Sequence, residues 1–276
     1  MLTASELKAL LQVHGLRLTK RLGQHHLIDA RAIERIVAQC DLSGRETVVE
    51  IGAGLGALTE PLARQAGRVV AVDVDRGIAS LLAERIASCA NVTVLHQDIL
   101  TFPWEAHAGA TVVGAIPYHI TSPIVVALTQ ARRHLRRAIL VVQEEVAERL
   151  VAKPGTKSYG RLSVLGQFGW ELSIALRVPR SAFFPQPDVD SACLRMLPRP
   201  IAPVAARDEG RFFEVVAAAF GHRRKTLANC LSQAGLAQRS TIPALLQRLG
   251  LPEAVRGETL SIEQFAQLAN ALGQLK

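Results

Sequence analysis

The chain has 276 residues, of which 49% are hydrophobic and 20% are charged, and its formal net charge is +8. This composition excludes a disordered chain and allows one large domain, or one large and one small domain. The excess of positive charge favours a polyanionic partner, with nucleic acid as the first candidate. No stretch approaches the ~20 consecutive apolar residues of a membrane span, so we expect a cytoplasmic protein without a membrane segment.

The N-terminal region predicts two helices joined by a basic loop. The residues Thr3-Ala4-Ser5-Glu6 are typical of a capping box at the start of a helix, which Gly15 ends. Residues 17–29 are basic and then polar, and we expect an ordered loop there. A second helix follows near 30–39.

Short apolar runs and amphipathic helical patterns then alternate. Strand-like runs lie at 47–52, 69–74, 92–96, 111–115 and 138–143, and helical patterns at 56–66, 76–88, 121–131 and 144–152. This alternation predicts βαβ units and a parallel sheet, an α/β fold of the Rossmann-like kind. Two further strand candidates, near 162–176 and 190–197, follow without a clear helix between them. We expect them to form an antiparallel hairpin at one edge of the sheet.

The C-terminal part has a different pattern. Residues 198–206 contain three prolines and predict a linker. Beyond it, apolar residues recur with a helical period, and Ser261-Ile262-Glu263-Gln264 is a second capping box. We therefore predict a catalytic domain at 1–198 and a small all-α domain at 207–276.

A glycine-rich turn follows the first strand of the alternating region. Residues 50–56 read Glu-Ile-Gly-Ala-Gly-Leu-Gly. Glycines let the chain turn tightly and let a ligand approach the backbone. The spacing is G-x-G-x-G, whereas the dinucleotide fingerprint is G-x-G-x-x-G. It favours S-adenosylmethionine over NAD; a tight turn without a ligand remains the alternative.

Acidic residues end the next two strands. Asp73 lies about twenty residues past the turn, where a carboxylate accepts hydrogen bonds from the ribose hydroxyls of a nucleoside cofactor. Asp75 fits a helix N-cap better. Asp98, after the third strand, could accept from an adenine amino group. All these positions lie at carboxyl ends of strands, where open α/β sheets bind ligands, and together they predict a methyltransferase.

Pro117 and Tyr118 follow the fourth strand at the same edge. Proline stiffens the corner, and tyrosine offers a flat face on which a base can stack. A tyrosine packed in the core is the alternative.

Longer motifs accompany these residues, at 23–27 (GQHHL), 48–63, 97–100, 116–124, 143–167, 182–192 and 220–231. In them the chain resembles, over essentially its whole length, the small-subunit ribosomal RNA adenine N6,N6-dimethyltransferases, which are related to the erythromycin-resistance rRNA methylases. The resemblance implies a class I methyltransferase domain, a helical RNA-binding domain and S-adenosylmethionine as methyl donor. It implies two adjacent adenines in small-subunit rRNA, within an immature subunit, as the substrate. We expect a monomer that needs no metal.

The resemblance also implies roles for particular residues. Cofactor contacts are expected at His25, Leu27, Gly52, Gly54, Asp73, Asp98 and Ala115. Ala115, Pro117 and Tyr118 match the acceptor motif Asn-Leu-Pro-Tyr, and Phe183 matches an aromatic residue that brackets the target base. RNA contacts are expected at Arg223, Arg224, Lys225 and Lys153.

Three positions depart from the family pattern. His25 and Ala115 each stand where asparagine is usual, and Asp188 replaces a usual lysine. The departure at Ala115 matters most, because an adenine amino group is a poor nucleophile whose lone pair is delocalised into the ring. An asparagine oxygen and a backbone carbonyl aim that lone pair at the methyl carbon, and losing one such contact typically costs about 10²–10³ in rate. The alternative to an enzyme is a non-catalytic ribosome assembly factor on the same fold.

Basic residues form further clusters, at 132–137, at Lys153, Lys157 and Arg161, and at Arg17, Lys20 and Arg21. For any single cluster a solvated face is the alternative. Taken together in a basic chain, they favour contact with RNA phosphates.

The cysteines and histidines give no sign of a metal centre. Cys40, Cys89, Cys193 and Cys230 are far apart, which indicates neither a zinc site nor a disulfide framework. Six histidines also lack metal-site spacing, and we expect them to be surface or capping residues: His14, His26, His96, His107, His119 and His222.

Overall fold

The computed structural model describes residues 2–16, 25–117, 120–199, 208–222 and 224–274. The chain divides into two compact units, one made of residues 1–147 and 171–198 and the other of residues 148–170 and 199–276. The first unit contains a β-sheet with flanking helices, and the second is helical. The C-terminal unit is thus larger than the 207–276 expected from the sequence, since residues 148–170 group with it. Part of the reason is aromatic packing, because Phe168 stacks on Phe212 with ring centroids 4.4 Å apart.

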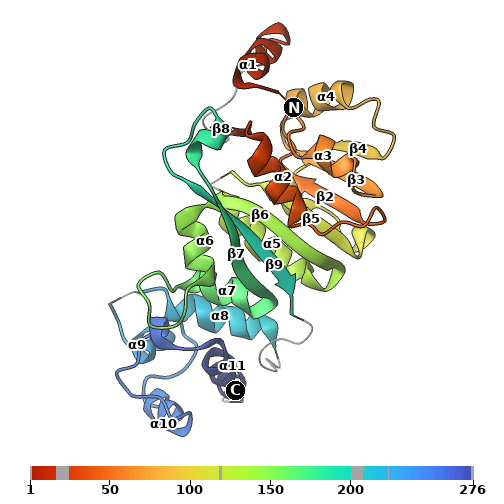
Figure 1. The fold of residues 1–276 in the computed structure, drawn as a ribbon. Helices are drawn as coiled ribbons and strands as arrows, with labels where there is room; N and C mark the ends of the chain where they lie inside the picture. Colours follow the sequence, from red (N-terminus) through yellow and green to blue (C-terminus); the bar gives the residue numbers. More distant parts are fainter. Residues whose placement is uncertain (1, 17–24, 118–119, 200–207, 223, 275–276) are drawn as a thin grey trace. The chain divides into compact units, whose positions relative to one another are not determined.

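Seven strands form the main sheet of the first unit (Figure 1). Their order is β4 (Val92–His96), β3 (Arg68–Asp73), β2 (Thr47–Ile51), β5 (Ala110–Ala115), β6 (Leu135–Gln143), β9 (Ser191–Pro198) and β7 (Trp170–Val178). The five strands from β4 to β6 pair in parallel, and β9 runs antiparallel to β6. The predicted Rossmann-like α/β class is confirmed.

Helices flank this sheet (Figure 1): α2 (Ala30–Ala38), α3 (Thr59–Ala63), α4 (Arg76–Arg85) and α5 (Thr121–Ala131). The apolar face of α2 places Ile33 and Ile36 in a buried cluster with Val48 and Val69 of the sheet. Helix α4 begins at Asp75, whose carboxylate accepts hydrogen bonds from two backbone N–H groups at distances of 2.9 and 3.1 Å. Asp75 is therefore the N-cap that the sequence indicated.

The N-terminal helix α1 (Ala4–Val13) begins at the predicted capping box. The Glu6 N–H donates to the Thr3 hydroxyl, and the Thr3 N–H donates to the Glu6 carboxylate. Leu7 and Leu11 bury their side chains in a cluster with Leu55. The basic loop expected next lies mostly in residues 17–24, which are outside the described residues.

One predicted strand is partly a helix. Residues 162–176 were expected to be extended, but α7 (Arg161–Gly169) occupies the first half and β7 only the second. Most of the α7 side chains are buried, among them Leu162, Val164 and Phe168. A helix that is apolar nearly all round lacks the one-sided period that separates helix from strand in a sequence. Strands β7 and β9 do lie side by side at one edge of the sheet, as expected.

A second, two-stranded sheet was not predicted. Strand β1 (His26–Leu27) pairs antiparallel with β8 (Phe183–Phe184), so that His26 lies opposite Phe184 and Leu27 opposite Phe183. This pairing connects segments more than 150 residues apart, and it joins the motif at 23–27 to the motif at 182–192.

The helical unit contains α7, α8 (Glu209–Ala219), α9 (Leu227–Gln233), α10 (Ile242–Arg248), α11 (Ile262–Gly273) and the last half of α6 (Glu144–Val151). Its core includes Phe212 and Phe265, both fully buried. The second capping box forms as predicted, since the Gln264 N–H donates to the Ser261 hydroxyl and the Ser261 N–H donates to the Gln264 side chain. The predicted linker lies largely in residues 200–207, outside the described residues. No helix of the described chain is long and apolar enough to cross a membrane.

The strand order reverses between β2 and β5, because the chain continues from β2 to β3 on one side and places β5 on the other. Ile51 and Gly114 are register partners across this point. A Cβ atom on Gly114 would lie 2.5 Å from the Ile51 carbonyl oxygen, so only glycine allows the two strands this spacing. Ligands of open α/β sheets bind in the crevice at such a reversal.

Candidate cofactor and acceptor site

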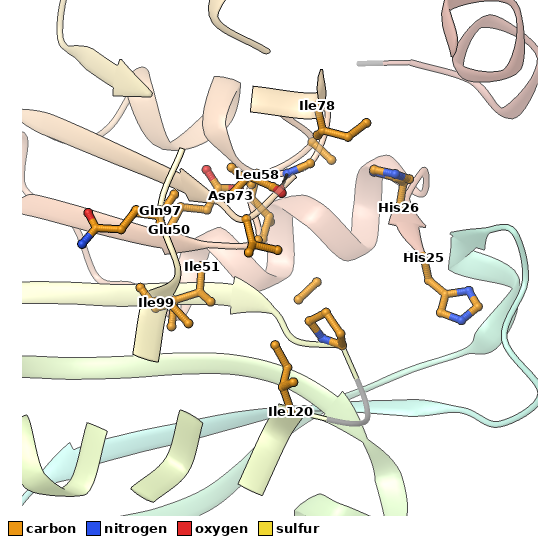
Figure 2. A pocket seen from close by; sticks show the side chains of 18 of the residues that line it. His25, His26, Glu50, Ile51, Leu58, Asp73, Ile78, Gln97, Ile99 and Ile120 are labelled. Atoms are coloured by element: carbon orange, nitrogen blue, oxygen red, sulfur yellow. Dashed lines mark hydrogen bonds between the residues drawn. The ribbon is translucent and has the colours of Figure 1, made fainter. Parts of the chain in front are cut away.

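A cavity of about 270 Å³ lies at the carboxyl ends of β2, β3 and β5 (Figure 2). Most of the predicted site residues line it: His25, Leu27, Gly52, Gly54, Asp73, Asp98, Ala115 and Pro117. The lining also includes an apolar set that the sequence did not single out, consisting of Ile51, Leu58, Val72, Ile78, Ile99 and Leu100. A mostly apolar cavity with a few convergent polar groups is typical of a small-molecule site.

The glycine-rich turn forms one wall. Gly52 and Gly54 have φ angles of +66° and +55°, a left-handed conformation that favours glycine. The Gly52 N–H donates to the Val72 carbonyl at 2.9 Å, which fixes the turn against β3. The turn therefore presents backbone rather than side chains to a ligand.

Asp73, the last residue of β3, binds the turn. One carboxylate oxygen accepts from the Gly54 N–H and the other from the Asp75 N–H, both at 2.9 Å. Burial raises the pKa of Asp73, and these two N–H donors oppose that rise. Each carboxylate oxygen has a second lone pair, so the carboxylate is oriented and can still accept from a diol.

Asp98 follows β4 and also lines the cavity. Its carboxylate accepts from the Leu100 N–H at 2.9 Å and caps a short 3₁₀ helix, Ile99–Thr101. Ile99 is buried directly behind it, and the side chain of Leu100 is 42% exposed. An acidic acceptor beside aliphatic side chains suits the edge and face of a purine ring.

His25 lies beside the turn on the other side of the cavity. Its Nδ1 atom is 2.7 Å from the Pro185 carbonyl oxygen. A carbonyl only accepts, so Nδ1 carries a hydrogen and donates to it. Leu27, two residues later, is 3% exposed and packs beneath the cavity.

The acceptor corner follows β5. Ala115 is half-buried at the end of the strand, and its carbonyl oxygen faces Gly52, 3.8 Å from where a Cβ would stand on that glycine. The Pro117 carbonyl accepts from the Ile120 N–H at 3.1 Å and from the Thr121 hydroxyl at 3.3 Å, which ties the corner to the start of α5. Tyr118 lies outside the described residues, so its stacking role stays a prediction.

Phe183 does not line the cavity. Its side chain is 5% exposed and belongs to the same buried cluster as Leu27 and Val178. The base-bracketing role predicted for it stays a prediction, and it would require this side chain to become accessible.

Glu50 is a site feature that the sequence did not reveal. It is 1% exposed at the base of the cavity, and its carboxylate accepts from the Thr59 hydroxyl at 2.6 Å. Burial raises the pKa of Glu50 to about 8, the Thr59 hydroxyl opposes this rise, and the Asp73 carboxylate adds to it. Near neutral pH this carboxyl group is protonated, and its hydrogen bond with Thr59 connects β2 to the first turn of α3.

Replacing Glu50 with glutamine is expected to remove a pH dependence of stability. The folded state retains a proton that the unfolded chain releases above about pH 4.5, so the free energy of unfolding should fall by about 1.4 kcal/mol per pH unit until about pH 8. Glutamine does not titrate, and Glu50→Gln should be the more stable protein by about 3 kcal/mol at pH 7. Urea unfolding between pH 5 and 8 measures this difference. Glu84→Gln, on the exposed surface of α4, is the matched control, and equal pH slopes for wild type and Glu50→Gln would contradict the assignment.

The expected RNA-binding residues belong to the helical unit. Lys153, Arg224 and Lys225 are exposed, and Arg223 lies outside the described residues. The Gly155 N–H donates to the Glu258 carbonyl, and the Leu227 N–H donates to the Val255 carbonyl, both at 2.8 Å. The loop around Lys153 and the start of α9 therefore lie against one segment, 255–258. The exposed Arg256 lies in the same segment and pairs with Glu258 at 3.9 Å.

The cluster at 132–137 is less available to phosphates than its sequence suggests. Arg136 pairs with Glu46 at 2.6 Å, and Arg137 pairs with Asp41 at 2.8 Å. Arg132 is buried and donates to the Thr129 carbonyl. These arginines stabilise the fold around the start of β6.

Among the described residues, no group of three or more His, Cys, Asp or Glu side chains could hold a metal ion. The four cysteines are present as free thiols, and Cys40 and Cys193 are buried in one cluster.

Comparison with solved structures finds proteins of the same fold. A dimethyladenosine transferase from Plasmodium falciparum shares the fold, with a TM-score of 0.77 at 24% identity, over 88% of this chain and 95% of that one. The 23S rRNA methyltransferase ErmE is 30% identical, with a TM-score of 0.66, over 90% of this chain and 99% of that one. The second similarity confirms the predicted relation to the erythromycin-resistance methylases.

Sequence comparison identifies the family. The ribosomal RNA small subunit methyltransferase A of Geobacillus kaustophilus is 42% identical, over 99% of this chain and 97% of that protein. The protein of the same name from Bacillus mycoides is 41% identical, over 98% of this chain and 96% of that protein. Both names favour an enzyme over a non-catalytic factor, and they confirm the prediction of a methyltransferase. A family model described as ribosomal RNA adenine dimethylase matches residues 15–274, and the chain belongs to that family.

Proposed function

We propose that this chain transfers methyl groups from S-adenosylmethionine to N6 of two adjacent adenines in small-subunit ribosomal RNA during ribosome maturation. The observation that carries the proposal is the shared cavity, which brings the glycine turn, Asp73 and the Ala115–Pro117 corner together. The names of the relatives support the ribosomal substrate. We further propose that the chain acts as a monomer on the immature subunit in the cytoplasm.

The residues of the cavity fit the methyl donor. Asp73 would accept from the ribose hydroxyls, and Asp98 from the adenine amino group, with Ile78 and Ile99 against the ring. His25 also lines the cavity and would lie near the methionine part, with its Nδ1 atom held by the Pro185 carbonyl. The donor supplies a methyl group on a sulfonium sulfur, and the C–S bond breaks as the N6–C bond forms.

The acceptor corner would orient the adenine. The Ala115 carbonyl and the backbone of the Pro117 corner lie at the end of β5, within the same cavity as the glycine turn. A backbone carbonyl that accepts from the N6 amino group aims the nitrogen lone pair along the line of transfer. No strong base is required, because the proton can leave to water after the methyl group has been transferred.

The direct test is transfer of radiolabelled methyl groups to immature small-subunit particles, followed by nucleoside analysis. Dimethyladenosine at two adjacent positions supports the proposal, and labelled products other than methylated adenine contradict it. Absence of transfer, with both the cofactor and the particle bound, would favour the non-catalytic assembly factor, which Ala115 and His25 suggest as the second candidate.

Reversing two charges in the helical unit should weaken binding to the particle. Each lost phosphate contact lowers the slope of log affinity against log salt by roughly 0.7 to 0.9, so Arg224→Glu/Lys225→Glu should lower it by about 1.5. Cofactor affinity should not change, because these residues lie in the other unit. Arg64→Glu/Arg68→Glu makes the same change of charge near the amino end of β3, away from the site edge, and serves as the control. A salt slope that is identical in both variants would mean that Arg224 and Lys225 are merely solvated.

A further inference from the structure

His26 is half-buried, whereas the sequence predicted a surface or capping residue. It forms half of the short strand β1 and lines the cavity. Its Nε2 atom is buried and has no hydrogen-bond partner within the part of the chain that the structure describes. Figure 2 shows that the His26 ring projects toward the strand end that carries Asp73, whereas His25 projects the other way.

The ring lies against the glycine turn. A Cβ atom on Gly54 would stand 2.8 Å from Nδ1 and 2.9 Å from Cε1 of His26, so glycine is needed there for space as well as for its left-handed φ angle. Nε2 is bonded to Cε1 and is therefore close to the same turn. The Gly54 N–H in turn donates to Asp73. His26 is thus next to the part of the cavity where a ribose and the atoms attached to it would lie.

A buried ring nitrogen without a partner is destabilising, because it has lost its hydrogen bonds to water and gained none in return. Such groups are rare in folded proteins and are explained when a ligand completes them. Burial, with a smaller contribution from the neighbouring His25, lowers the pKa of His26 to about 4. The ring is therefore neutral near pH 7, with one nitrogen as donor and one as acceptor.

We propose that Nε2 of His26 forms a hydrogen bond with the bound methyl donor, which adds a binding contact that the family resemblance does not assign. This inference rests on the proposed function, because it takes the ligand of the cavity to be S-adenosylmethionine. A neutral imidazole nitrogen can accept a hydrogen bond from a hydroxyl of the ribose, or, in the other tautomer, donate one to the carboxylate of the methionine part. Both groups would lie within the reach of a ring that contacts Gly54.

The test compares binding of S-adenosylhomocysteine, by calorimetry, to wild type and to His26→Phe. Phenylalanine preserves a flat ring of similar size but has no nitrogen, so the affinity should fall roughly 3- to 10-fold, the effect of one neutral hydrogen bond. His26→Gln restores a polar group and should recover part of the loss. His107→Phe is the matched control, because His107 stacks on Phe102 and does not line the cavity. Thermal melts verify that all variants are folded.

A second ligand locates the contact. 5′-Methylthioadenosine has the ribose but lacks the amino-acid part. A loss for both ligands supports a contact with the ribose, and a loss for S-adenosylhomocysteine alone supports a contact with the carboxylate. If folded His26→Phe binds both ligands within twofold of wild type, or more tightly, the inference is overturned while the proposed function stands. If wild type binds neither ligand, the proposed function fails first.

Discussion

Replacing Ala115 with asparagine is expected to raise the single-turnover rate of methyl transfer by up to about 100-fold. The reason is geometric. Ala115 is the last residue of β5 and is half-buried. It lines the cavity together with the glycine turn, which follows the neighbouring strand β2. An amide at this position would add a hydrogen-bond acceptor for the adenine amino group, next to the backbone carbonyl already present.

Ala115→Leu is the matched control, because leucine has nearly the shape of asparagine without the amide. It should not raise the rate, and it will lower the rate if the site is crowded. Rapid-quench measurements with labelled cofactor and immature particles would give all three rates. If the asparagine variant is slower than an already active wild type, another group has taken the role of the amide and the explanation given for Ala115 is wrong.

Replacing Asp73 with alanine is expected to weaken cofactor binding roughly 30- to 1,000-fold, which corresponds to about 2–4 kcal/mol for two charge-assisted hydrogen bonds. The structure adds a second reason for the loss. The same carboxylate accepts from the Gly54 and Asp75 N–H groups, so alanine also releases the glycine turn. Asp73→Asn retains one oxygen acceptor and should give an intermediate loss.

Calorimetry with S-adenosylhomocysteine measures both Asp73 variants. The control is Asp75→Ala, two residues later. It removes the N-cap of α4 and should reduce stability by about 1 kcal/mol while leaving cofactor affinity nearly unchanged. Wild-type affinity in a folded Asp73→Ala protein would exclude Asp73 from the site.

The sequence predicted much of the fold because local signals and tertiary structure agree. Thr3 and Ser261 begin helices through capping boxes that are visible in four residues. The parallel strands β2, β3, β5 and β6 are largely apolar runs, as expected for strands buried on both faces, whereas the edge strand β4 is partly exposed. Helix α7 was missed because its apolar residues surround the helix, and β1 and β8 were missed because each has only two residues and a distant partner.

The candidate site likewise contains residues that the sequence could place and residues whose environment it could not predict. Gly52, Asp73 and Ala115 follow strands, so the sequence could place them at one edge of the sheet. The environments of Glu50 and His26 could not be predicted, because their properties depend on what surrounds them in three dimensions. Glu50 becomes a neutral acid only when Thr59 and the sheet enclose it. His26 loses its partners only when β1 pairs with β8 and its ring meets Gly54.

The close contact between Gly114 and Ile51 limits how this corner can evolve. Any side chain at residue 114 would push β5 away from β2, because its Cβ would stand 2.5 Å from the Ile51 carbonyl oxygen. Residue 115 already carries a side chain and lines the cavity, so that restriction does not apply to it. A substitution at residue 114 would therefore disturb the sheet, whereas one at residue 115 would change the lining of the site. Exchange between alanine and asparagine at this position therefore requires no repair of the sheet.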